Sequence, residues 1–430
     1  MNKFVISSIL KITSHRVVAI IAIILMVIGL QFPDNPVFLS IGMMLLVVNV
    51  LFSPNVKQNI SMFLSDKTLI ALTLIFFIFL VSGINSTDMA YYSERVRIKL
   101  PFLALPIAFV VFRGKPVQWF YWMLYLFFIT IVILCGYEFG QYVSDYSTIN
   151  KLYRTSYVID TPGSHVRFSL MITFAIFVGA YLTQKQFLSA YKAVYISTIA
   201  LTVFLIVYLH ILAVRSGVLA FYLCLFYLVL YVIFKAKNYK AGALFLLVLI
   251  ALPFIAVRVF PTLESKLDYT KYGISQYAQQ HEVNHMSDGA RIESEIVGYR
   301  LFRAHWLTGT GIGDMQDEMN KLYAKDFPDV LPEYRLIPHN EFLVYAVGCG
   351  IFGLLAFIAI LLFVLCYKRS WQHWLYMVFN IIVLSSFLTE PTIEEQVGTA
   401  FYIIFILVLY FLIHYSDDAP VSASLDKSKV

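Results

Sequence analysis

A histidine and an asparagine stand directly before a long apolar stretch in the last quarter of the sequence. They follow a proline, in the order Pro338-His339-Asn340, and Gly350 and Gly353 come ten and thirteen residues after the asparagine. Histidine takes up and releases a proton near neutral pH without a shifted pKa. Proline has no amide hydrogen and suits a helix start. We therefore expect His339 at the rim of a membrane helix, as the general base that accepts the proton of an attacking hydroxyl.

The neighbours of this histidine receive supporting assignments. Asn340 is expected to orient the ring or the substrate, and Glu341 is a second, less favoured base. Gly350 and Gly353 are expected to let the helix bend or pack closely, without a chemical role. A rim histidine that is merely solvated by lipid headgroups is the alternative for His339.

Arginines are the second group of residues suited to chemistry. Arg215 lies in HILAVRSGVLAFY, between two apolar stretches with almost no loop, where a cation is costly unless it is paired or functional. Arg291 opens an amphipathic stretch, residues 290–306, on which Arg300 and Arg303 follow. A guanidinium matches two phosphate oxygens at once. Arg215 and Arg291 are predicted to hold a diphosphate, and one of Arg300 and Arg303 to join them. Snorkelling to headgroups and loop salt bridges are the alternatives.

Carboxylates gather in the segment LTEPTIEEQ, which contains Glu390, Glu394 and Glu395. Like-charged neighbours raise a carboxyl pKa, so Glu390 is a candidate second base, although solvated charges are the simpler interpretation. The sequence has no DxD and no His, Asp or Glu set at metal-ligand spacing. Two or three arginines can supply the positive charge that a diphosphate leaving group needs. We therefore predict a reaction without a metal or another cofactor.

The composition is that of a polytopic membrane protein. Of 430 residues, 60% are hydrophobic and 13% charged, whereas soluble domains are about a quarter charged. The mean hydropathy is +0.76. We predict an all-α membrane helix bundle of about twelve spans. The predicted spans are 17–32, 36–53, 68–84, 100–112, 116–135, 166–183, 193–213, 216–234, 241–259, 341–366, 371–388 and 398–414.

Charged residues predict the orientation of these spans. With both termini cytoplasmic, the inside segments carry sixteen Lys and Arg against four Asp, a balance of +12. The outside segments carry sixteen Lys and Arg against 22 acids, a balance of −6, and together these give the formal +6. This asymmetry follows the positive-inside rule, so the net charge does not indicate a nucleic-acid partner. The outside cations are ten Arg and six Lys, which favours specific anion binding on that side.

Four regions follow from this topology. Residues 1–259 are predicted to form the first nine spans, residues 260–338 a large, partly helical periplasmic loop, residues 339–415 the last three spans, and residues 416–430 a cytoplasmic tail. A loop as long as the second region is unusual without secondary structure. We expect a helix over residues 290–306 that lies on the bundle or in the interface. The run G-x-G-x-G from Gly309 to Gly313 is a turn rather than a nucleotide loop, because a preceding strand and the Walker lysine are missing.

Three of these features resemble the bacterial O-antigen ligase family: Arg215-Ser216-Gly217, the region of Arg291, and the motif HN-x9-G-x-x-G at His339. The resemblance implies an inverting, GT-C-like glycosyltransferase of the bacterial inner membrane that works in lipopolysaccharide biosynthesis with its active site facing the periplasm. Its donor would be an undecaprenyl-diphosphate-linked glycan, and its acceptor the lipid A-core oligosaccharide.

Other functions remain open at this point. An O-antigen polymerase and a protein O-oligosaccharyltransferase share the histidine motif and differ in the acceptor. A polysaccharide transporter or flippase belongs to another class. Against a transporter, the ionisable residues of this sequence cluster at the predicted outer rim rather than at mid-membrane, and a pair of interrupted spans is missing.

Overall fold

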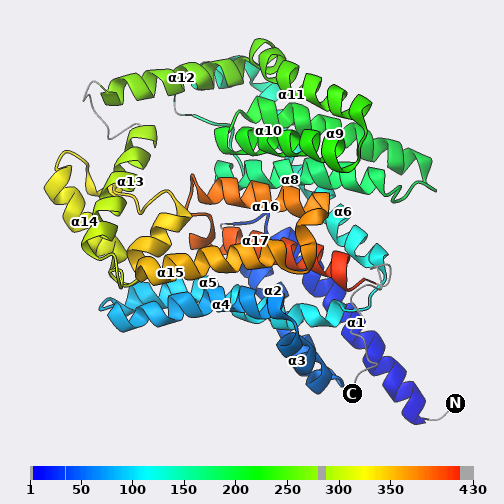
Figure 1. The fold of residues 1–430 in the computed structure, drawn as a ribbon. Coiled ribbons are helices and arrows are strands. Elements are labelled where there is room, and N and C mark those ends of the chain that lie inside the picture. The colour runs from blue at the N-terminus through cyan, green and yellow to red at the C-terminus, as the bar shows by residue number, and fades with distance from the viewer. Residues whose placement is uncertain (1–2, 34, 156, 279–286, 417–430) are drawn as a thin grey trace.

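The computed structural model describes residues 3–33, 35–155, 157–278 and 287–416, and it is helical throughout (Figure 1). Within these residues it has α-helices joined by short turns and 3-10 segments, and no strand, which confirms the predicted all-α class. The predicted cytoplasmic tail lies outside the described residues except for Ser416. In chain order the helices are α1 (Lys3–Gly29), α2 (Val37–Leu51), α3 (Val56–Ser65), α4 (Lys67–Ser82), α5 (Met89–Ala108), α6 (Val117–Ser144), α7 (Tyr146–Leu152), α8 (His165–Gln184), α9 (Lys192–Leu212), α10 (Arg215–Leu230), α11 (Tyr239–Val259), α12 (Pro261–Ala278), α13 (Ser287–Ala304), α14 (Met315–Asp326), α15 (Glu341–Cys366), α16 (Trp374–Phe387) and α17 (Gln396–His414).

Long apolar helices form the bundle that was expected for a multi-pass membrane protein. In the described part of the chain, eight are long and apolar enough to cross a membrane, or nine if α2 and α3, bent by 108°, make one span. Each of the twelve predicted spans falls on a helix, but α16 and the His15–Gly29 part of α1 are shorter apolar helices. Helix α5 carries Glu94, Arg95, Arg97 and Lys99, too many charges for an ordinary span.

The site lies at one end of this bundle, which we call the α13 end. Helices α8, α10, α15 and α17 all begin there, and α12, α13 and α14 occupy the long loop between α11 and α15. In Figure 1, α13 and α14 lie at the left, whereas α1 begins and α17 ends at the right. The core between the ends is apolar, and α8 and α17 are its most buried spans.

Gly350 explains how the long loop is attached to the bundle. It interrupts α15 with a φ of +67°, a conformation that residues with a Cβ rarely adopt. At this kink the amide of Ile351 donates to the carbonyl of Trp306 at 2.8 Å, and the amide of Thr310 donates to that of Val347 at 2.8 Å. The predicted turn at Gly309–Gly313 therefore docks on α15 through its backbone, and the expected bend at Gly350 is confirmed.

Candidate functional site

His339 lies between the end of the long loop and the first turn of α15, with 16% of its side chain exposed. Pro338 packs directly over Gly298 of α13, and the His339 amide donates to Ser294 Oγ at 3.3 Å. The ring Nδ1 is 3.2 Å from the carbonyl oxygen of Ile337. Because a carbonyl only accepts, the hydrogen belongs on Nδ1, and Nε2 keeps its lone pair.

The surroundings of His339 keep its ring neutral. Burial lowers the pKa of His339 to about 4, and the nearby cations Arg291 and Arg167 act in the same direction. The Nε2 atom is 3.9 Å from Oε2 of Glu390. At neutral pH the ring of this histidine is therefore unprotonated, and the Glu390 carboxylate lies near its Nε2 atom.

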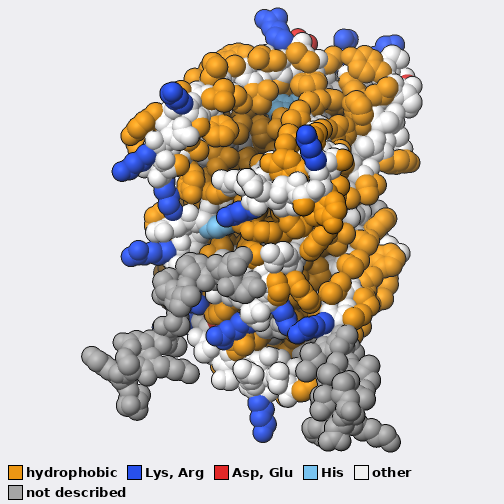
Figure 2. All heavy atoms as spheres, turned by 90° about the vertical axis from the view of Figure 1, so that its right-hand side faces the viewer, with side chains coloured by type: hydrophobic (Ala, Val, Ile, Leu, Met, Phe, Trp, Pro, Cys, Tyr) orange, Lys and Arg blue, Asp and Glu red, His pale blue; other side chains and the backbone are white. Residues whose placement is uncertain are grey.

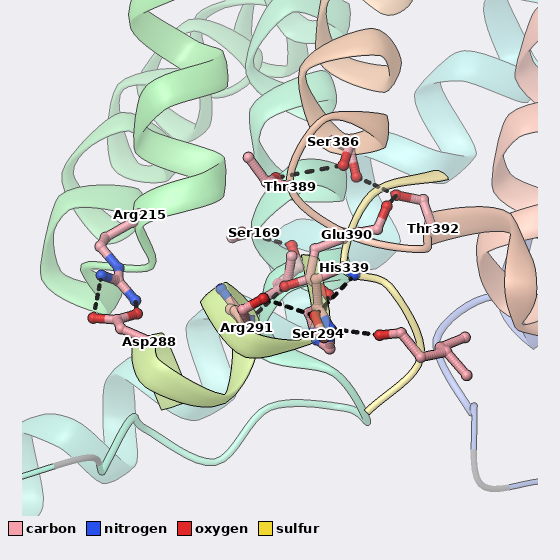
Figure 3. A network of polar contacts seen from close by, with 12 residues as sticks. Ser169, Arg215, Asp288, Arg291, Ser294, His339, Ser386, Thr389, Glu390 and Thr392 are labelled. Atoms are coloured by element: carbon pink, nitrogen blue, oxygen red, sulfur yellow. Dashed lines mark hydrogen bonds and ion pairs between the residues drawn. The ribbon is translucent and has the colours of Figure 1, made fainter. Parts of the chain in front are cut away.

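Glu390 belongs to the connection between α16 and α17, and it faces both His339 and α13. It forms an ion pair with Arg291 of α13, and 12% of its side chain is exposed. Burial raises the pKa of the Glu390 carboxyl, although Arg291 and Arg167 oppose the shift. Arg291 thus links α13 to the segment that supplies Glu390, and Figure 3 shows Arg291, Ser294, His339 and Glu390 converging from three separate parts of the chain.

Arg215 is the first residue of α10 and forms the other side of the site (Figure 3). Its guanidinium pairs with both carboxylate oxygens of Asp288, one turn before Arg291 on α13, and donates to Thr270 Oγ1 of α12 at 3.3 Å. The chain reverses between α9 and α10 in two residues, through Ala213 at φ 50°. The tight connection predicted from the sequence is therefore real, and it sets Arg215 at the mouth of the bundle.

Lys266 and His165 complete a cluster of basic groups that sequence reasoning missed. Lys266 lies one turn before Thr270 on α12, and its ammonium donates to the carbonyl of Tyr157 at 3.1 Å. Burial lowers the pKa of Lys266 to about 8, and the nearby Arg215 adds to the shift. His165, at the start of α8, lies within electrostatic reach of Lys266, Arg215 and Arg291. The signal in the sequence was weak, since Lys266 lies among other charges in an amphipathic stretch.

A buried lysine of α5 holds the segment that carries Glu390. Lys99 of α5, with no exposed side-chain surface, donates to Glu394 Oε1 at 2.6 Å and to the carbonyl of Ile393 at 2.5 Å. Glu341, the first residue of α15, accepts from the amide of Ile393 at 3.0 Å. Arg95 donates to the Glu394 carbonyl at 3.0 Å. The signal for Lys99 in the sequence is that an ionisable residue stands directly before a predicted span.

Several predicted roles change with these positions. Asn340 is the N-cap of α15, where its side-chain oxygen accepts from the amides of Phe342 and Leu343, so it has a structural role at the helix start that the sequence analysis did not predict. Glu341 is buried and engaged, not an open base. The interpretation of the acidic cluster as plain solvated charges is wrong for Glu390 and Glu394, although Glu395 is exposed and pairs with Arg167 at 2.5 Å.

Of the two later arginines of α13, Arg300 does not face the site. Arg300 pairs with Asp326 of α14 at 2.6 Å. Nine residues make about two and a half helical turns, so Arg300 points away from the side that carries Arg291. Arg303 is exposed near the end of α13. The described residues contain no group of three or more His, Cys, Asp or Glu side chains that could hold a metal ion.

Residues 199–358 match the family model described as O-antigen ligase. The matched segment runs from α9 to the middle of α15 and includes Arg215, Arg291 and His339, but not Glu390 or Lys99. A comparison with curated proteins found no match.

Proposed function

Since the match over residues 199–358 makes this chain a member of the O-antigen ligase family, we propose that it is a ligase that transfers O-antigen glycan from undecaprenyl diphosphate to the lipid A-core oligosaccharide. One observation carries the proposal: a neutral histidine with a free lone pair lies near Arg291, and Arg291 and Arg215 are each engaged by a carboxylate that a phosphate can replace.

The donor diphosphate would occupy the place of these carboxylates. Asp288 on Arg215 and Glu390 on Arg291 present two oxygens and a negative charge, as a phosphate group does. The donor would bind between α10, α12 and α13 and displace both carboxylates. Lys266 is near enough to contribute a third positive charge.

His339 would act on the acceptor. The acceptor hydroxyl gives its proton to Nε2 as its oxygen attacks the anomeric carbon of the donor sugar, from the side opposite the diphosphate. The bond from this carbon to the diphosphate oxygen breaks, and the electron pair leaves with the diphosphate, whose charge Arg215 and Arg291 stabilise. Glu390, released from Arg291, then accepts a hydrogen bond from the protonated ring. Because the attack comes from the side opposite the leaving group, the step inverts the anomeric configuration.

The orientation of the chain supports a reaction outside the cytoplasm. Figure 2 looks onto the end opposite α13, where basic side chains are spread over an apolar surface and acidic ones are scarce. The positive-inside rule assigns such an end to the cytoplasm. The α13 end, with Arg215 and His339, would then face the periplasm across a bacterial inner membrane.

The test is a deletion strain complemented with the wild-type chain or with His339→Ala, analysed by lipopolysaccharide gels. Loss of a general base lowers transfer by roughly 10²–10⁴-fold. For a ligase, the variant strain would keep long glycan on its lipid carrier and show bare lipid A-core.

Other outcomes would correct the proposal. Lipid A-core with a single repeat unit would indicate a polymerase. Normal lipopolysaccharide with a glycoprotein that has lost its sugar would indicate a protein glycosyltransferase. Wild-type behaviour of His339→Ala in all three respects would contradict the mechanism. The ligase is favoured because the arginines concentrate in one long loop, whereas a polymerase is expected to carry matched sets in two.

A further inference from the structure

A groove of about 450 Å³ runs between α2 and α5, on the side of the bundle away from α12. Its ends differ in chemistry. At the α13 end, Gln396 of α17 donates to Ser40 of α2 at 2.9 Å, and Arg97 of α5 also lines the groove. Below this point the lining is apolar, from Met43, Met44, Val47 and Val48 of α2 and Leu100, Pro101 and Ala104 of α5.

The dimensions of the groove fit a lipid chain below a polar head. Arg97 and Ala104 are seven residues apart on α5, which is about 10 Å along a helix axis. That is the length of about eight methylene groups. The two methionines have flexible side chains that can adapt to a chain of variable shape. The groove is therefore polar where a headgroup would lie and apolar where the membrane interior begins.

Arg97 is the charged side chain of the groove that could contact the headgroup of a bound lipid. It is exposed, and it takes part in no ion pair within the part of the chain that the structure describes, whereas Arg95 and Lys99 on the same helix are both engaged by Glu394. Pro101, one turn later, has no amide hydrogen to offer to the Arg97 carbonyl. The head of the groove thus offers a guanidinium for a phosphate and a backbone acceptor for a sugar hydroxyl.

The α13 end of the groove adjoins the segment that carries Glu390, because Gln396 lines the groove. Gln396 follows Glu395 directly, and residues 388–395 carry Glu390. This segment lies between α13 and α5, because Glu390 pairs with Arg291 of α13 and Glu394 pairs with Lys99 of α5. A lipid seated in the groove would therefore bring its headgroup to one side of the segment while the donor binds at the other.

We propose that the α2–α5 groove binds an acyl chain of a phosphorylated glycolipid with its phosphate on Arg97, and that this lipid is the acceptor. The identity of the lipid as acceptor rests on the proposed function; its binding does not. A larger groove of about 670 Å³ between α4 and α15 also opens on the bundle surface, but no charged side chain lines it. Charge complementarity therefore favours the α2–α5 groove.

The binding experiment uses the purified full-length protein and native mass spectrometry. The probes are a hexa-acylated lipid A with phosphates, the same lipid after dephosphorylation, and phosphatidylglycerol. Arg97→Ala and the groove-filling Ala104→Trp should each weaken binding of the phosphorylated glycolipid about tenfold, and Arg97→Lys should recover part of the loss. Arg258→Ala and Ala251→Trp on α11 are the matched controls and should bind as the wild type does.

Equal binding of all three lipids, or equal losses in the α11 controls, would overturn the groove as a specific site. Transfer kinetics then test the acceptor role. In Arg97→Ala the KM for the acceptor should rise about tenfold, with kcat and the KM for the donor within twofold of wild type. Wild-type kinetics despite weakened binding would overturn the acceptor role. Specific binding in a protein that does not transfer to lipid A-core would refute the proposed ligase function and leave the lipid site standing.

Discussion

At the scale of single residues, the site contains a histidine of low pKa, His339, and nearby cations that lower this pKa further. His339 is kept neutral by burial and by Arg291, and Glu390 is drawn to Arg291 rather than to the ring. A bound diphosphate would neutralise Arg291 and release Glu390. Both changes favour the protonated ring, so the histidine would become a stronger base only when the donor is in place.

The pH dependence follows from two shifted groups. In the free enzyme the base form of His339 is lost as the pH falls through about 4, and the charge of Lys266 is lost as the pH rises through about 8. We expect kcat/KM for the donor to be flat between these limits and to fall on both sides, since this parameter reports the free enzyme. Lys266→Arg should shift the alkaline limb upward, because a guanidinium stays charged. An alkaline limb that is unchanged in Lys266→Arg would remove Lys266 from the donor site.

The arginines should not be replaceable by lysine. Arg215 contacts both oxygens of a carboxylate, and a lysine offers a point charge instead of a planar fork. Each lost charge-assisted hydrogen bond is worth about 1.5–3 kcal/mol, so Arg215→Lys and Arg291→Lys should lower transfer about 10- to 100-fold. The measurement is transfer by purified variants at equal amounts of inserted protein. Arg300→Lys, on the far side of α13, is the control and should keep full activity.

Transfer should also persist in excess EDTA. The positive charge that the leaving diphosphate needs is available from Arg215, Arg291 and Lys266. Complete loss of transfer, restored by Mg²⁺ or Mn²⁺, would contradict this expectation and direct attention to Glu390 and Glu395.

At the scale of elements, charged side chains from three helices hold the segment between α16 and α17, in addition to Arg291 of α13. Lys99 from α5, the Glu341 carboxylate from α15 and Arg167 from α8 each contact it. These contacts position Glu390 without taking part in chemistry. Because the segment has only a short 3-10 turn of its own, Thr392–Glu394, its shape depends on these partners.

Removal of Lys99 should therefore loosen this segment. Lys99→Met removes the ammonium that lies 2.6 Å from the buried Glu394 carboxylate and leaves only Arg95, at 4.0 Å. Because breaking a buried ion pair costs about 3–5 kcal/mol, the melting temperature of the purified protein should fall clearly. Adding Glu394→Gln to this variant should restore part of the lost melting temperature, since the double variant no longer buries the negative charge of Glu394. Lys271→Met, an exposed site on α12, should leave the melting temperature unchanged. A stable Lys99→Met variant would mean that the buried lysine does not hold the segment.

At the scale of the whole molecule, we expect the end that is rich in basic residues to face the cytoplasm and the α13 end to face the opposite side of the membrane. Reporter fusions at Ser275 in α12 and at Lys237 between α10 and α11 should give opposite signals, with Ser275 outside the cytoplasm. Fusions at both positions that report the same side would contradict the topology, and a cytoplasmic Ser275 would remove the proposed access to a periplasmic substrate.

The class of the protein and the positions of His339 and Arg215 follow from local features of the sequence. The length of the apolar stretches predicts a helix bundle, and adjacency in the chain places His339 at the mouth of α15 and Arg215 at the start of α10. These are local properties, because the solvent and the helix period act on neighbouring residues.

The other residues of the site could be recognised only from the way the helices pack. Asp288 lies 73 residues from Arg215, and Glu394 lies 295 residues from Lys99, so no local pattern could pair them. Arg300 shares α13 with Arg291 but pairs with α14 instead of facing the site. Glu390 lies beside His339, whereas its neighbours Glu394 and Glu395 pair with residues of α5 and α8. The direction of a side chain and the partner that neutralises a buried charge depend on how helices pack, and packing brings together parts of the chain that the sequence keeps far apart.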